Sequence, residues 1–137
     1  MLNRRTARTL AAAGVALLVA AGRSARYEIA ERSMEPTLRP GDWVIALRST
    51  RRVRRGDVVI VEHPARPGFE MVKRVAALSG DRAPGAGVVI PPGGVWLLGD
   101  NPAAGSVDSV VLGSFPLDAV RARVVARYHP FPPRRVR

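Results

Sequence analysis

The chain has no cysteine, a single lysine and only two histidines among its 137 residues. The lack of cysteine excludes disulfides, thiolate metal sites and cysteine nucleophiles. Both histidines, His63 and His129, precede a proline, and a zinc site needs more ligands than these two can supply. We therefore expect both histidines at the surface and no metal site. Aromatic residues make up 5% of the sequence, too few for a platform on which nucleic-acid bases stack.

Negative charge is also scarce: the chain has 11 acidic and 22 basic residues, which gives a net charge of +11. Such an excess suggests an anionic membrane or nucleic acid as a partner. Nearly all of the basic residues are arginines, and Lys73 is the exception. Arginine keeps its proton in proteins, whereas a buried lysine can lose it. Lys73 is therefore either a chance survivor of a bias toward arginine or a lysine with a chemical task.

No long hydrophobic run is present, but a short alanine-rich one extends from Thr9 to Gly22 between flanking arginines. As a helix it would span ~21 Å, less than the ~30 Å of a bilayer core. Three interpretations remain open: a weak membrane anchor, a signal-peptide-like segment, or a helix packed on the domain. We favour the anchor, which predicts a cell-membrane location, with a cytoplasmic location as the alternative. The expected division is a basic, hydrophobic segment over 1–26, a domain over 27–130 and a basic tail over 131–137.

Short runs rich in β-branched residues fill the rest of the chain, separated by Gly-Asp, Pro-Gly and Gly-Gly pairs. Short strands with frequent turn signals predict a mainly β fold, either a sandwich or a barrel. Arginines that alternate with small apolar residues near the end of the chain predict one solvated face. The tail after 131 is expected to fray. The predicted strands are Trp43–Leu47, Val58–Glu62, Glu70–Ala77, Gly87–Ile90, Val95–Leu98 and Val120–Tyr128.

Ser33 opens a Ser-Met-Glu-Pro-Thr-Leu segment with the features of a rigid turn. Pro36 fixes its own φ and keeps Glu35 out of the helical region. The turn can therefore expose Ser33 and leave its backbone N–H free to face an oxyanion. A serine hydroxyl is a poor nucleophile until a base takes its proton. No histidine is placed to do this.

Lys73 is the candidate base, because it lies in an apolar strand segment with Met71, Val72 and Val75. Burial among such side chains lowers the pKa of a lysine and leaves more of it neutral. A turn serine alone, or a strand lysine alone, would be an ordinary structural residue. Taken together they predict a serine hydrolase that works without histidine.

Four segments, in this order and spacing, resemble the Ser-Lys signal peptidase family (peptidase family S26) in its small bacterial form. The resemblance covers roughly Glu31 to Pro130, and it implies a mainly β, signal-peptidase-like fold with a short N-terminal hydrophobic helix. It also implies a serine endopeptidase without a cofactor that removes an N-terminal signal peptide or propeptide from a precursor protein, with membrane association. The segments are Ser33–Leu38, Gly56–Val59, Lys73–Val75 with Gly80-Asp81, and Gly99–Asn101 with Ser106–Ser109.

The resemblance also assigns roles to individual residues. Ser33 would be the nucleophile, Lys73 the general base, and Ser106 the residue that orients Lys73 by a hydrogen bond. The remaining assignments are an ion pair of Arg74 with Asp100, a supporting role for Asp108, and a substrate cleft lined by Met34 and Pro36.

Three positions depart from the family pattern. Glu31 stands two residues before the nucleophile, where a small or hydroxyl residue often completes the oxyanion hole. Val110 stands where the last segment normally has arginine, so Asp108 loses its expected partner. The loop before Ser106 is one residue longer than in most small members, with Gly105 as the extra residue. Each departure is expected to lower activity without abolishing it.

A narrower resemblance, to the maturation protease of nickel-type superoxide dismutase, rests on the segments 62–68, 71–75 and 98–102. It would make the substrate a cytoplasmic precursor whose new amino terminus binds nickel. Two rival functions remain. A repressor-type self-cleaving Ser-Lys protease would cut at Ala21-Gly22, which lies too near Ser33, and no helix-turn-helix precedes that site. A non-catalytic basic module could hold anionic lipid or nucleic acid through the arginines between 48 and 55, although we expect no nucleic-acid partner.

Overall fold

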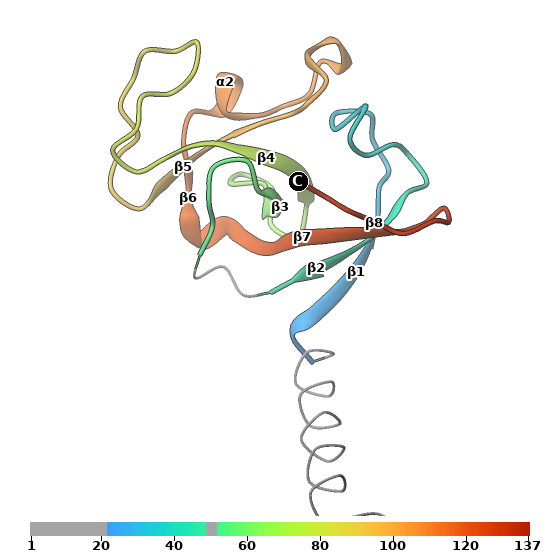
Figure 1. The fold of residues 1–137 in the computed structure, drawn as a ribbon. Coiled ribbons are helices and arrows are strands. Elements are labelled where there is room, and N and C mark those ends of the chain that lie inside the picture. Colours follow the sequence, from blue (N-terminus) through green and yellow to red (C-terminus); the bar gives the residue numbers. More distant parts are fainter. Residues whose placement is uncertain (1–21, 49–51) are drawn as a thin grey trace, which may run out of the picture.

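The computed structural model describes residues 22–48 and 52–137, which form one curled antiparallel sheet (Figure 1). The strands follow the order β1-β2-β7-β3-β4-β5-β6, and β8 pairs with β7. The prediction of a mainly β fold is therefore confirmed. The strands are β1 (Ser24–Glu28), β2 (Trp43–Leu47), β3 (Val58–Glu62), β4 (Glu70–Leu78), β5 (Gly94–Leu98), β6 (Phe115–Pro116), β7 (Val120–His129) and β8 (Arg134–Arg135), and the helical turns are η1 (Pro102–Ala104), α2 (Ser109–Leu112) and η2 (Leu117–Ala119).

The expected N-terminal helix, and with it the anchor over residues 9–22, lies outside the described residues except for Gly22. Within 22–48 and 52–137 no helix combines the length and hydropathy that a membrane crossing requires. The first strand begins at Ser24, so pairing in the sheet starts before the boundary that we placed after residue 26.

The apolar run 58–61 of β3 is buried on both faces of the sheet. Val58 and Ile60 join one hydrophobic cluster, whereas Val59 and Val61 join another. Successive side chains of a strand point to opposite faces, so the curled sheet covers both faces of β3. The first cluster contains Ile29, Met34, Leu38, Val44, Ala46, Ala122 and Val124, and the second contains Val75, Val95, Leu97, Phe115 and Val120.

Two sequence-based predictions, one about a strand and one about the C-terminal tail, are wrong. The segment Gly87–Ile90 is a loop with one isolated bridge between Arg82 and Val89, because Gly85 and Gly87 both adopt a positive φ and turn the chain. The tail does not simply fray, since Arg134 and Arg135 pair with β7. Strands β1, β6 and β8 were missed because they are short or mixed in polarity.

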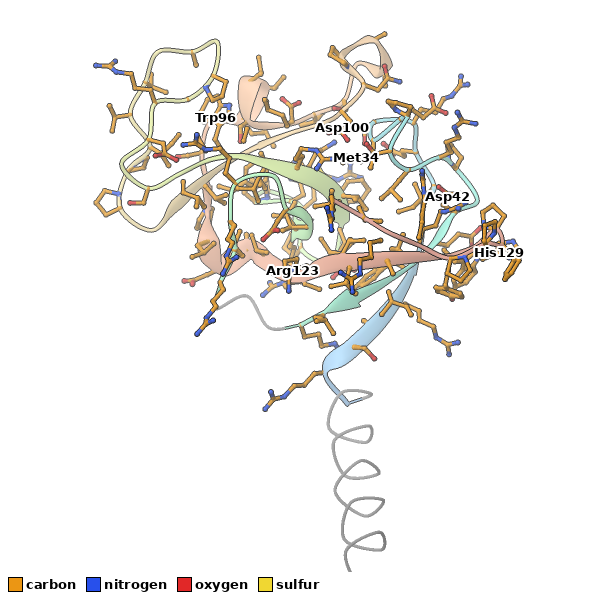
Figure 2. All side chains as sticks on the ribbon, viewed as in Figure 1. Met34, Asp42, Trp96, Asp100, Arg123 and His129 are labelled. Atoms are coloured by element: carbon orange, nitrogen blue, oxygen red, sulfur yellow. The ribbon has the colours of Figure 1, made fainter. Side chains whose placement is uncertain are left out.

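The predicted solvated face of β7 holds only in part. Arg121 is exposed and bonds Glu62, and Arg123 lies farther along the same strand (Figure 2). The side chain of Arg127, by contrast, is 13% exposed, lies 3.8 Å from Asp42 and donates to the carbonyl of Pro132. The returning tail therefore covers the end of the face that we expected to be wet.

Candidate functional site

Ser33 lies in a tight turn that begins soon after β1 and is anchored in the core. Within the turn, Glu35 N donates to Arg32 O at 3.1 Å and Leu38 N donates to Met34 O at 2.9 Å. Met34 and Leu38 are buried in the first hydrophobic cluster. Ser33 itself is only 7% exposed, in contrast to the exposed position that we expected. Its hydroxyl is reached through the cavity described below.

Lys73 occupies the middle of β4 and is 3% exposed. Its neighbours in the sheet hold it there: Val59 lies opposite on β3, and Arg74 and Val75 pair with β5 on the other side. Burial lowers the pKa of the Lys73 amine, while the negative charges of Asp108 and Glu31 act in the opposite direction. The net pKa lies below its ordinary value, so the neutral amine is more accessible than in an exposed lysine.

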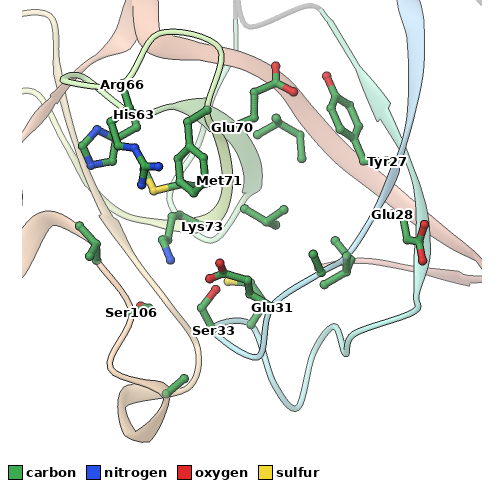
Figure 3. A pocket seen from close by; sticks show the side chains of 18 of the residues that line it. Tyr27, Glu28, Glu31, Ser33, His63, Arg66, Glu70, Met71, Lys73 and Ser106 are labelled. Atoms are coloured by element: carbon green, nitrogen blue, oxygen red, sulfur yellow. The ribbon is translucent and has the colours of Figure 1, made fainter.

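Ser33 and Lys73 line one cavity of about 400 Å³ (Figure 3). The amine of Lys73 points toward the hydroxyl of Ser33 and the carboxylate of Glu31. Among the described residues, no direct hydrogen bond joins Ser33 Oγ to Lys73 Nζ. The cavity therefore holds a hydroxyl, an amine of lowered pKa and a carboxylate in one space. The first two are the groups that acyl transfer requires.

The segment after β5 supports the Ser33 turn through its backbone. Asn101 N donates to Ser33 O at 2.9 Å, and Asn101 Nδ2 donates to Arg32 O at 3.1 Å. Gly99 packs so closely that a Cβ there would lie 2.8 Å from both Ser33 O and Ser106 Oγ. Any side chain at Gly99 would therefore displace the backbone of Ser33.

Arg74, on the opposite face of β4 from Lys73, forms a two-pronged ion pair with Asp100. Its Nε and Nη2 atoms each lie 2.7 Å from a carboxylate oxygen, and Nη1 donates to Gly56 O at 2.7 Å. Thr37 Oγ1 also donates to Asp100. Burial raises the pKa of Asp100, but the hydrogen bonds from Arg74 and Thr37 outweigh it and hold this pKa below its usual value. The pair joins β4, the Ser33 turn and the segment after β5.

Ser106 lines the cavity near Ser33 and Lys73, but no hydrogen bond between Ser106 and Lys73 is present among the described residues. Asp108 instead caps α2. Its carboxylate accepts from Val110 N at 3.0 Å and from Gly99 N at 3.2 Å. Backbone N–H groups therefore satisfy Asp108 where the family pattern would supply an arginine. Val110, at the position of that arginine, is 72% exposed.

The cavity walls differ from the cleft predicted by the resemblance. Met34 contributes to the wall, whereas Pro36 is exposed and does not line it. His63 is half-buried at the rim rather than free at the surface, because its ring packs edge-on against Phe69. Arg66 lies over the same Phe69 ring at 4.4 Å. His129 is exposed, as expected.

Sequence reasoning gave no role to several residues that organise the site. Thr37 belongs to the segment Ser33–Leu38, but its hydrogen bond to Asp100 depends on the folded arrangement of the two segments. Ser109 is fully buried and accepts from Leu97 N at 2.8 Å, which fixes α2 on β5. The close packing at Gly99 could have been predicted from the glycine of the Gly-Asp-Asn segment, because glycine permits close approach of two backbones.

Comparison with known proteins identifies one family. The family model described as "Signal peptidase, peptidase S26" matches residues 2–84, a range that includes Ser33 and Lys73 and ends before Asp100. Mitochondrial inner membrane protease subunit 1 of Mus musculus is 36% identical over 110 residues, covering 72% of this chain and 66% of its own length. The Homo sapiens subunit 1 is 36% identical over 109 residues, covering 72% and 65%.

A shorter match, over 58 residues at 36% identity, is to signal peptidase I of Aquifex aeolicus, covering 40% of this chain and 23% of that protein. This chain spans just under two thirds of the length of the inner membrane protease subunits.

Proposed function

The chain belongs to the S26 signal peptidase family, and from this premise we propose that it is a serine endopeptidase that removes an N-terminal segment from a precursor protein. Ser33 would be its nucleophile and Lys73 its general base. The observation that carries the proposal is the shared cavity, in which a nearly buried serine meets a buried lysine of lowered pKa.

In the proposed reaction, neutral Lys73 takes the proton of Ser33 as Oγ attacks the scissile carbonyl. The protonated amine then gives this proton to the leaving amine, and an acyl-enzyme on Ser33 results. Lys73 next takes a proton from water, which attacks the ester and releases the acyl product. The proton returns to Ser33 as the leaving oxygen departs. Ser106, at the cavity wall, is the candidate to position the amine.

The backbone N–H of Ser33 is the candidate donor to the developing oxyanion. Among the described residues it makes no hydrogen bond to another group, so it is available to a ligand in the cavity. A preorganised donor of this kind is a major source of transition-state stabilisation in acyl transfer. Glu31 opposes this effect, because its carboxylate adds negative charge to the same cavity.

Two classes of precursor fit the proposal. One is a secretory precursor with an Ala-x-Ala site, because Met34, Ile60 and Val72 give the cavity apolar walls suited to small side chains. The other is the precursor of nickel superoxide dismutase, from the narrower resemblance of residues 62–68, 71–75 and 98–102. The relatives named as inner membrane protease subunits support association with a membrane.

Incubation of the purified full-length protein with each precursor, in mild detergent, tests the proposed function. Cleavage of one precursor at a single bond is expected, and mass spectrometry of the new amino terminus identifies the site. Ser33→Ala protein prepared in the same way reports any contaminating protease. Intact precursors with the wild-type protein, or equal cleavage by Ser33→Ala, would contradict the proposal.

The pH dependence of cleavage should respond to Glu31. Its negative charge raises the pKa of Lys73, so Glu31→Gln lowers this pKa, and more of the amine is neutral at a given pH. The acidic limb of kcat/KM against pH is therefore expected to move to lower pH. On a peptide without charged side chains, the loss of repulsion toward the oxyanion should also raise kcat by about two- to fivefold. A matched change at an exposed carboxylate outside the cavity, Asp118→Asn, should leave the profile unchanged; movement of the limb to higher pH would contradict this assignment.

A further inference from the structure

Most of the carboxylates without a partner line one cavity, although the chain is rich in arginine. Most acidic side chains accept a hydrogen bond or form an ion pair, namely Glu35, Asp42, Asp57, Glu62, Asp81, Asp100 and Asp108. Among the described residues, four side chains have no such contact: Glu28, Glu31, Glu70 and Asp118. Three of these four line the cavity of Ser33 and Lys73, and only Asp118 lies elsewhere. The cavity therefore carries three carboxylates without a basic partner among the described residues, although the net charge of the chain is +11.

Glu31 and Glu70 both line the cavity and lie well apart from each other (Figure 3). The carboxylate of Glu31 lies beside Ser33 and the amine of Lys73. Glu70 begins β4 and lies near Tyr27, whose pKa is raised first by burial and second by the charge of Glu70. Glu70 precedes Lys73 by three strand positions, a separation of ~10 Å in an extended chain. Glu28 adds its charge at the rim on β1.

The basic groups around the cavity do not neutralise these carboxylates by direct contact. Arg66 lies over the ring of Phe69, and His63 Nδ1 accepts a hydrogen bond from Ala65 N. Lys73 is 3% exposed, its amine points into the cavity, and it has no hydrogen bond or ion pair among the described residues. The amine is therefore free to meet a polar group of a ligand that enters the cavity. A ligand that also carries a positive charge would satisfy the carboxylates.

We propose, building on the endopeptidase function above, that Glu31 and Glu70 make this cavity select a peptide with lysine or arginine within about three residues of the scissile bond. A basic side chain next to the scissile residue would meet Glu31, and one three residues away would meet Glu70. The selected substrate is thus a basic precursor segment, in contrast to a neutral or acidic one.

Binding of fluorescent peptides to Ser33→Ala protein in detergent tests this selection without requiring catalysis. The peptides share one apolar sequence and carry Lys, Gln or Glu at each of the three positions on either side of the bond. At about 0.01 M ionic strength, where screening is weak, we expect the best Lys peptide to bind about fivefold more tightly than its Gln counterpart and the Glu peptide more weakly still. The Lys preference should shrink as salt is added.

Glu31→Gln and Glu70→Gln, each made in the Ser33→Ala background, should reduce the Lys-to-Gln ratio to about twofold or less at the position that each carboxylate serves. The matched control Asp118→Asn should retain the full ratio. Equal binding of Lys and Gln peptides at all six positions would overturn the proposal, as would a ratio unaffected by both glutamate variants. If Lys peptides bind more tightly but the wild type cleaves neither precursor, the charge selection stands and the endopeptidase function is wrong. If the wild type cleaves a precursor but shows no preference for Lys peptides, the endopeptidase function stands and the charge selection is wrong.

Discussion

Lys73→Met is expected to lower kcat by at least about 10,000-fold while the protein remains folded. Loss of the base leaves Ser33 as an unactivated hydroxyl, and residual catalysis would come only from binding and the oxyanion donor. The same change removes a charged group from a site where it is 3% exposed. Methionine has a similar length and no charge, so it fits among the apolar neighbours Val72 and Val75.

The stability of this variant should depend on pH in a defined way. Burial lowers the pKa of Lys73 in the folded state, so between this pKa and the unfolded value of about 10.4 the unfolded chain binds more protons. The free energy of unfolding of the wild type therefore rises with pH across this window, and below it the full cost of the buried charge is present. Lys73→Met is expected to be more stable than the wild type at neutral pH, with a difference that narrows toward pH 10.

Denaturant unfolding at several pH values, with cleavage rates measured in parallel, checks both parts of this prediction. Ser33→Ala is the matched control, because it should lose a similar amount of activity without the pH-dependent gain in stability. A Lys73→Met protein that cleaves at more than about a hundredth of the wild-type rate would show that another group acts as base. A variant less stable than the wild type at neutral pH would show that Lys73 is favourable in its charged form.

Gly99→Ala is expected to lower kcat by at least about 100-fold through displacement of the nucleophile. The new Cβ would lie 2.8 Å from Ser33 O and from Ser106 Oγ, so the backbone that carries Ser33 must move. Displacements of about 1 Å at a catalytic group cost about this factor in rate. Overpacking of this kind also costs about 1–3 kcal/mol of stability.

Replacement of a second glycine tests whether the loss of activity comes from the displacement of Ser33 or from glycine replacement in general. Gly80 follows β4 with φ of 85°, and a Cβ there would meet nothing within 4 Å. Asparagine tolerates this conformation, so Gly80→Asn should keep kcat within about twofold of the wild type. Steady-state cleavage of one precursor by the two variants gives the comparison. Full activity of Gly99→Ala would mean that the position of Ser33 does not depend on this contact.

Patterns that depend on neighbouring residues were predicted well from the sequence. The strands β2 and β3 match the runs of β-branched residues, and β4, β5 and β7 differ only at their ends. The apolar surroundings of Lys73 were also visible, because Met71, Val72 and Val75 are close in sequence. Local composition determines which segments can form a buried strand, and these are the segments that the pattern identifies.

Features that depend on distant segments were not predicted. Strand β1 contains two charged residues and pairs only because β2 presents a complementary edge. The burial of Ser33 and the capping role of Asp108 depend on the segment after β5, which packs against the Ser33 turn. The gathering of unpartnered carboxylates around the cavity is likewise invisible in a sequence, because Glu31 and Glu70 are far apart along the chain.

The pairing of β3 with β4 fixes the position of the Lys73 amine, whereas the loop between the two strands determines which residues form the cavity rim. Val59 lies opposite Lys73, and the strands are joined by a loop over residues 63–69 that supplies His63, Arg66 and Phe69 to the rim. The register is held by the buried strand residues, so the loop can be exchanged while Lys73 stays in place. This hairpin is therefore a natural point for grafting loops from other proteases, and a library confined to it would diversify substrate choice on an unchanged chemical centre.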